Sequence, residues 1–151
     1  MAMVANLSCD GGSRGNPGKA GIGFRLESMG EIKAEGGAFI GETTNNVAEY
    51  KALIWGLRNA KELGVERLLV RADSELLVQQ MRGSYKVKDD KLIPLHQEAS
   101  QLAGWFTDCR FMHVKREENQ AADLMANKAM DKESMVGSYL VPYVSAPDAL
   151  L

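Results

Sequence analysis

The chain has 151 residues, a formal net charge of −2 and a pI near 5.7, and 45% of its residues are hydrophobic. This length and composition fit one soluble globular domain with its own core, and they exclude a disordered or repetitive chain. The charge excludes a protein that binds nucleic acid through a strong overall basic field, so any such binding has to be local.

Cysteine usage and the N-terminus bear on the compartment. Cys9 and Cys109 show no C-x-x-C spacing, so we interpret both as reduced core residues. No run approaches the ~20 apolar residues of a membrane span, and the N-terminus lacks the pattern of a secretory signal. We therefore expect a cytoplasmic protein that has no membrane contact and no obligate protein partner.

Alternating apolar residues predict three strands in the first part of the chain. They fall in residues 4–9, 22–26 and 32–40. The first is expected to end at Asp10, and the glycine-rich stretch GGSRGNPG after it is interpreted as a wide turn. Met29 and Gly30 are typical of a hairpin between the second and third strands. The three strands should form an antiparallel meander.

Beyond residue 45 the apolar period becomes that of a helix. A helix of about five turns is followed by a strand, two helices, a strand and a final helix. These lie in residues 50–60, 66–72, 74–81, 92–106, 109–114 and 119–130. Because strand, helix, strand crossovers join parallel strands, the last two strands should run parallel to the first. The sequence predicts a mixed α/β fold in the order βββαβααβα, with a five-stranded mixed sheet flanked by helices.

Four carboxylates lie beside the ends of these elements, and each has an ordinary structural explanation. Asp10 would belong to a turn, and Glu49 would complete a capping box three residues after Asn46. Asp73 would cap a helix, and Asp123 would favour the positive end of the last helix dipole. Taken one at a time, these explanations are favoured over catalysis.

The predicted topology favours a catalytic role over these structural explanations, because it brings the acids together. Neighbouring parallel strands lie about 4.8 Å apart, so Asp10 is expected beside Asp73 at the edge where open α/β sheets bind ligands. Glu49 and Asp123 could point into the same crevice. Such a cluster would repel itself unless a divalent cation neutralised it, and oxygen ligands suit Mg²⁺ or Mn²⁺. Two ions about 4 Å apart could clamp the water and the leaving oxygen of a phosphodiester.

Four segments, in order and at sensible spacing, carry a resemblance to a known family. They are DGGSRGNPG, TTNNVAEYKAL, ADSELLVQQM and REENQAADLMANKAM. Together they resemble the active-site segments of type 1 ribonuclease H, and the resemblance runs from about Leu7 to Asp131. It implies a ribonuclease H-like fold, with a catalytic domain over residues 1–133. Residues 134–151 would be a tail that docks as an edge strand or trails loosely.

The resemblance implies an endoribonuclease that cuts the RNA strand of RNA/DNA hybrids and leaves 5'-phosphate and 3'-hydroxyl ends. Two Mg²⁺ ions, or Mn²⁺ as a substitute, are implied as cofactors. The implied catalytic and metal-binding residues are Asp10, Glu49, Asp73 and Asp123. The implied substrate-binding residues are Gly11, Gly12, Ser13, Asn16, Thr44, Asn45, Asn46, Ser74 and Arg116. Glycines in the first segment would let the backbone approach the hybrid.

The sequence departs from the best-known bacterial members, and in this it resembles archaeal and certain other bacterial ones. The connection REENQ is too short to carry the family's loop histidine. We interpret His113 as packed within a strand and Arg116 as a partial substitute that pairs with the departing phosphate. The short basic segment 82–91 predicts modest, salt-sensitive affinity. Two alternatives stay open: action on double-stranded RNA or a DNA junction, and an idle hybrid-binding module.

Overall fold

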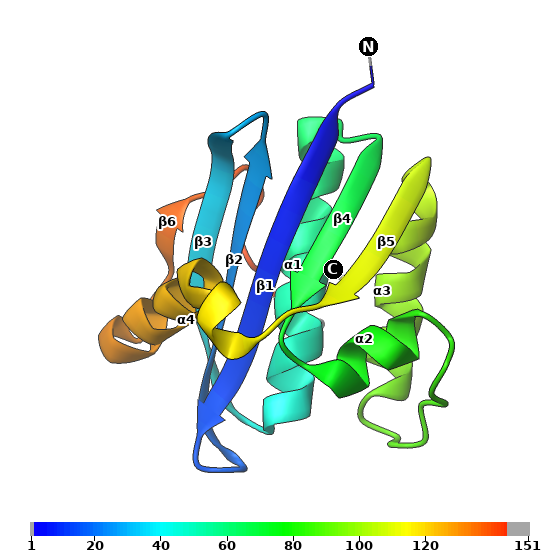
Figure 1. Cartoon of the computed structure of the whole chain (residues 1–151). Coiled ribbons are helices and arrows are strands. Elements are labelled where there is room, and N and C mark those ends of the chain that lie inside the picture. The colour runs from blue at the N-terminus through cyan, green and yellow to red at the C-terminus, as the bar shows by residue number, and fades with distance from the viewer. Residues whose placement is uncertain (1, 145–151) are drawn as a thin grey trace.

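The computed structural model describes residues 2–144 of the chain. The strands are β1 (Val4–Arg14), β2 (Gly18–Ser28), β3 (Glu31–Thr43), β4 (Arg67–Ala72), β5 (Asp108–His113) and β6 (Val136–Ser138). The helices are α1 (Asn45–Leu63), α2 (Glu75–Met81), α3 (Ile93–Trp105) and α4 (Gln120–Lys132), with a 3-10 turn at Arg116–Glu118. The strands form one sheet in the order β5-β4-β1-β2-β3-β6, with α1 against one face and α4 against the other (Figure 1).

The predicted order and strand directions are confirmed, with one strand added in the described residues. β1, β2 and β3 form the antiparallel meander, while β4 pairs in parallel with both β1 and β5. The sixth strand, β6, pairs antiparallel with the edge of β3. Pairing as an edge strand is one of the two alternatives that the sequence left open for residues 134–151, although at three residues β6 is too short to show a period of two.

The part of the predicted tail that the structure describes lies against the domain. After β6, the Val141 carbonyl accepts hydrogen bonds from Trp55 Nε1 at 2.7 Å and from Asn59 Nδ2 at 3.2 Å. Asn59 Oδ1 accepts in turn from the Leu140 amide at 2.8 Å. Residues 145–151 lie outside the described residues, and the division of the chain at residue 133 stays a prediction.

β1 runs farther than the sequence indicates, so the wide turn predicted after Asp10 is wrong. Asp10 lies inside the strand, opposite Gly23 of β2, and pairing continues to Arg14. The reversal is confined to residues 15–17. Aspartate and glycine are typical turn formers, but here they extend a strand that stays paired with β2 up to Arg14.

Two glycines bring α4 unusually close to the sheet. A Cβ atom at Gly23 of β2 would lie 2.2 Å from the Ala122 carbonyl oxygen, and one at Gly37 of β3 would lie 2.1 Å from that of Met125. No larger residue fits at either position unless α4 moves away. The first turns of α4 are therefore held against the sheet at a spacing that glycine alone permits.

Two further expectations bear on the whole chain. Cys9 is buried, Cys109 is partly buried, and both are free thiols as predicted. None of the helices in residues 2–144 is both long enough and apolar enough to cross a membrane.

Candidate active site

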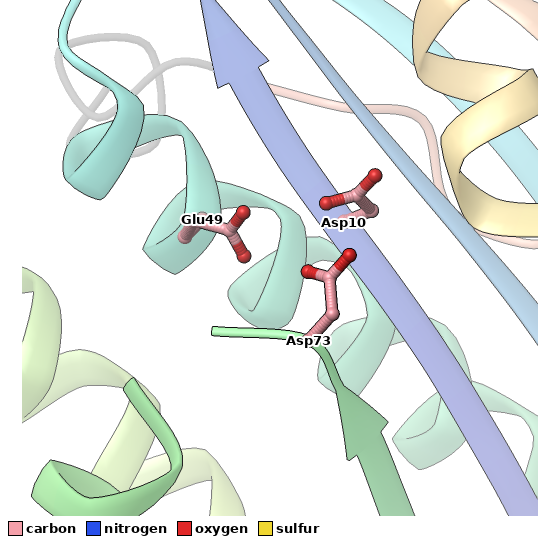
Figure 2. A group of neighbouring side chains, drawn as sticks. All are labelled: Asp10, Glu49 and Asp73. Carbon is pink, nitrogen blue, oxygen red and sulfur yellow. The ribbon is translucent and has the colours of Figure 1, made fainter. Parts of the chain in front are cut away.

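Three of the four predicted acids meet at the floor of one cleft. Asp10 comes from the interior of β1, Glu49 from the start of α1, and Asp73 from the residue that follows β4. Figure 2 shows their side chains turned toward one another. Each offers a carboxylate oxygen, and these oxygens all lie within 4.8 Å of one another. Asp10 is buried, and the other two are half-buried.

Two of these acids are free to face the cleft because neighbouring residues cap the helices. Thr44 caps α1, its hydroxyl accepting a hydrogen bond from the Val47 amide at 3.3 Å. Ser74 caps α2 by accepting from the Leu77 amide at 3.2 Å. The capping roles that sequence reasoning gave to Glu49 and Asp73 are therefore wrong.

The close crossing of β1 and α1 places Glu49 beside Asp10. A Cβ atom at Gly11 would lie 2.3 Å from the main-chain carbonyl carbon of Ala48, so this glycine lets the helix backbone touch the strand. The Gly11 amide also hydrogen-bonds the Glu49 carboxylate. At Gly12 the nearest atom to an added Cβ is 3.7 Å away. Packing thus accounts for the glycine at position 11, whereas a ligand contact at Gly12 stays a prediction.

The cluster is electrostatically costly without a cation. Burial, followed by the negative charges of Asp73 and Asp123, raises the pKa of Asp10 to about 8. Burial and the charges of Asp10 and Asp73 raise the pKa of Glu49 well above its usual value. Within residues 2–144, no lysine or arginine is paired with these acids, and Glu49 Oε2 is buried without a hydrogen-bond partner. Convergent oxygen donors with an unbonded buried carboxylate oxygen fit a divalent cation.

Asp123 lines the same cleft but lies outside the cluster of three. It sits in the first turn of α4, as predicted. Asn119, just before that helix, links it to the cluster through the main chain: its Nδ2 donates to the carbonyl of Cys9 at 2.9 Å, and its carbonyl accepts from the Asp123 amide at 3.2 Å. Because Cys9 precedes Asp10, this asparagine ties the start of α4 to the strand that carries Asp10.

Replacing Asn119 by alanine is expected to lower the free energy of unfolding by about 1–3 kcal/mol, because the buried Cys9 carbonyl loses its donor. Asn119 is 1% exposed, so water cannot replace the missing bond. Urea denaturation measures the change. Exposed Gln120→Ala, one residue on, serves as the control and should shift the value by less than about 0.5 kcal/mol. An Asn119→Ala protein as stable as this control would contradict the assignment.

Most of the predicted substrate-binding residues line the cleft, whose volume is about 540 Å³. Those that line it are Gly11, Gly12, Ser13, Asn45, Asn46, Ser74 and Arg116. Asn16 and Thr44 are not among its lining residues. Asn16 Oδ1 accepts from the Asn45 amide at 3.2 Å, and Asn45 Oδ1 accepts from the Ser13 amide at 2.7 Å. The turn after β1 and the start of α1 thus form one polar wall.

Sequence reasoning missed four residues that line the cleft, namely Arg14, Ala126, Asn127 and Met130, and it misjudged the exposure of His113 outside the cleft. Arg14 and Asn127 line the cleft and are hydrogen-bonded to each other. The spacing of four between Asp123 and Asn127 was the available signal, because such residues share a helix face. His113 is exposed on β5, so its interpretation as a packed residue is wrong. Arg82 of the basic segment donates to the Phe111 carbonyl at 2.9 Å and 2.6 Å, on the edge strand β5.

Comparison with known proteins supports a family assignment. A sequence model of the reverse transcriptase-like family matches residues 8–129. The chain is 45% identical over 131 residues to a bifunctional protein of Mycobacterium tuberculosis, covering 85% of this chain and 36% of that protein. It is 44% identical over 123 residues to ribonuclease HI of Halobacterium salinarum, covering 81% and 62%. It is 30% identical over 142 residues to ribonuclease H of Coxiella burnetii, covering 85% and 91%. The chain therefore spans less than two thirds of the first two relatives.

Solved structures agree with the sequence matches. The N-terminal ribonuclease H domain of the mycobacterial protein superposes with a TM-score of 0.85 at 42% identity, covering 87% of this chain and 96% of that one. LC11 ribonuclease H1 from compost, solved in complex with an RNA/DNA hybrid, has a TM-score of 0.79 at 41% identity, covering 86% and 97%. This chain therefore belongs to the reverse transcriptase-like family and, within it, to the type 1 ribonucleases H.

Proposed function

We propose that the chain is a metal-dependent endoribonuclease that hydrolyses the RNA strand of RNA/DNA hybrids and leaves 5'-phosphate and 3'-hydroxyl ends. The observation that carries the proposal is the convergence of Asp10, Glu49 and Asp73, from three separate segments, within 4.8 Å in one cleft. The choice of substrate is supported by the 41% identity to LC11 ribonuclease H1, which was solved with such a hybrid.

The acids of the cleft would hold two Mg²⁺ ions, with Mn²⁺ as a substitute. When bound, such ions activate a water molecule and neutralise the charge that develops on a phosphodiester. Asp10 is the central ligand, since Glu49, Asp73 and Asp123 all interact with its carboxylate. Glu49 contributes the buried Oε2 that has no protein partner in residues 2–144. Asp123 supplies an oxygen from the first turn of α4, which also lines the cleft.

The walls of the cleft would hold the two strands of the hybrid. Ser13, Asn16 and Asn45, joined by hydrogen bonds, present amide and hydroxyl groups that suit phosphate oxygens and base edges. Glu49 is placed to accept a hydrogen bond from a ribose 2'-hydroxyl, a group that DNA lacks. Arg116 lines the cleft before α4 and, as a fixed cation, would pair with the departing phosphate.

The proposal extends to the organisation and location of the chain. The catalytic unit comprises residues 1–133, and residues 134–151 form an extension of it. The two free thiols suit a reducing compartment, and we place the protein in the cytoplasm.

Cleavage of an end-labelled RNA/DNA hybrid by the wild-type chain tests the proposal. With Mg²⁺ or Mn²⁺ the RNA strand alone should be cut, EDTA should stop the reaction, and Asp73→Asn should lack it. Single-stranded RNA, double-stranded RNA and a DNA junction serve as competing substrates. Preferential cutting of another duplex would replace the substrate while keeping the chemistry. Tight hybrid binding without cutting would instead identify an idle binding module.

A further inference from the structure

The carboxylate of Asp123 is held by a side chain one turn farther along α4. Asn127 Nδ2 donates to Asp123 Oδ1 at 3.2 Å and to the Asp123 carbonyl at 3.0 Å. Both residues are half-buried and line the cleft. The three other acids bring their oxygens within 4.8 Å of one another, whereas Asp123 interacts with Asp10 and accepts a hydrogen bond from a neutral amide.

Arg14 determines which way the side-chain amide of Asn127 faces. Arg14, the last residue of β1, donates from a guanidinium nitrogen to Asn127 Oδ1 at 3.3 Å. A guanidinium has no acceptor, so it can bind only the oxygen of the amide, and the amide nitrogen must then face Asp123. Asp131, one further turn along α4, holds Arg14 in place through an ion pair of 2.7 Å. Asp123, Asn127 and Asp131 are therefore spaced by four along one face of α4, and Arg14 contacts both Asn127 and Asp131.

We propose that Asn127, oriented by Arg14, is a positioning residue that keeps the carboxylate of Asp123 facing the cleft. The inference rests on the proposed function, in which Asp123 is a metal ligand. Asp123 lies near the start of α4, where it lines the cleft beside Asp10, and its Oδ1 accepts a hydrogen bond from Asn127. Removing partners that orient a metal-ligating carboxylate typically costs 10–100-fold in metal affinity or activity.

The test compares four variants. Asn127→Ala removes the donor and keeps the helix, and Asn127→Asp keeps the shape but turns an acceptor toward Asp123. Arg14→Gln removes the guanidinium that donates to Asn127 Oδ1, so the side-chain amide of Asn127 can rotate. Lys19→Gln is the matched control, because Lys19 forms an ion pair of 2.8 Å with Glu133 at the end of α4, of similar exposure to that of Arg14 with Asp131 and without contact to Asn127.

Two activity parameters and two independent quantities are measured: kcat and KM on the hybrid, the Mg²⁺ concentration that gives half of the metal-induced rise in Tm, and the Kd for the hybrid in EDTA. Both Asn127 variants should lower kcat roughly 10–100-fold and raise the Mg²⁺ midpoint by a similar factor. The Kd in EDTA should stay within about twofold. Arg14→Gln should give a smaller change in the same direction, and Lys19→Gln should match the wild type.

Two results would overturn the inference. One is an Asn127→Ala protein whose kcat and Mg²⁺ midpoint lie within about twofold of the wild type. The other is a rise in the Kd for the hybrid equal to the fall in kcat/KM, which would make Asn127 a direct substrate contact. If the wild type itself does not cut hybrids, the proposed function has failed. The Mg²⁺ midpoint then decides the positioning role by itself, and an unchanged midpoint in Asn127→Ala rejects it.

Discussion

Asp10→Asn is expected to lower the rate of hybrid hydrolysis by roughly 10³-fold or more, while the protein without metal becomes more stable. The rate falls because Asp10 is the acid that faces all the others, and an asparagine offers a metal one neutral oxygen in place of a charged carboxylate. Single-turnover cleavage with Mg²⁺ measures this loss. The midpoint of thermal unfolding in EDTA measures the gain in stability.

The gain in stability of Asp10→Asn over the wild type is expected to grow as the pH rises. The pKa of Asp10 is about 8 in the folded protein, against about 3.9 in an unfolded chain. Between these values the folded state holds the proton more tightly than the unfolded state does, so the free energy of unfolding falls as pH rises from about 4 to about 8. Asparagine does not titrate and avoids this loss. Near pH 8 the variant should be more stable by about 1–3 kcal/mol, or about 3–10 °C in Tm.

Asp108→Asn is the matched control, because the same chemical change is made at the start of β5, outside the residues that line the cleft. Its kcat should stay within about twofold, and its Tm should not rise near pH 8. Mg²⁺ should raise the Tm of the wild type and of this control more than that of Asp10→Asn. Retention of a tenth of the wild-type kcat by Asp10→Asn would contradict the assignment of Asp10.

Gly11→Ala is expected to have the largest effect on stability. Its Cβ atom would lie 2.3 Å from both the carbonyl carbon and the oxygen of Ala48, and 2.7 Å from the Glu49 amide nitrogen. All three atoms are backbone, so the whole of α1 has to move away from β1. We expect a loss of about 3 kcal/mol or more in the free energy of unfolding, or about 10 °C in Tm. Activity should fall as well, because Glu49 moves with the helix.

The neighbouring Gly12→Ala separates this effect from any loss of backbone freedom. An added Cβ at Gly12 meets nothing closer than Asn45 Oδ1 at 3.7 Å, an ordinary contact distance. Its Tm should therefore stay within about 2 °C of the wild type. Equal Tm losses in the two variants would show that the contact between β1 and α1 is not the cause.

Most secondary structure could be predicted because it depends on local periodicity. The helical spacing from Tyr50 to Ala60 and the alternation around Phe24 each arise from which face of one element is buried. Helix caps were less predictable. Thr44 and Ser74 are each within two residues of the positions expected, and these small shifts release Glu49 and Asp73 toward the cleft. Caps depend on backbone angles that residue type only biases.

The extent of β1 could not be predicted for a different reason. GGSR after Asp10 has the composition of a turn, and its strand conformation is imposed by the helix that packs on Gly11. The contact of Arg14 with Asn127 joins residues 113 positions apart, so no local pattern contains it.

The sequence by itself determined the order of the elements, the parallel crossovers and the four acids that recur at strand and helix ends, because each is encoded in short-range spacing. The tertiary structure alone decided that three of these acids have carboxylate oxygens within 4.8 Å of one another, and that the fourth accepts a hydrogen bond from Asn127, which Arg14 contacts in turn. The physical reason is that these distances are set where backbones touch, at Gly11 between β1 and α1 and at Gly23 between β2 and α4. Which backbones touch depends on how elements distant in the chain pack together.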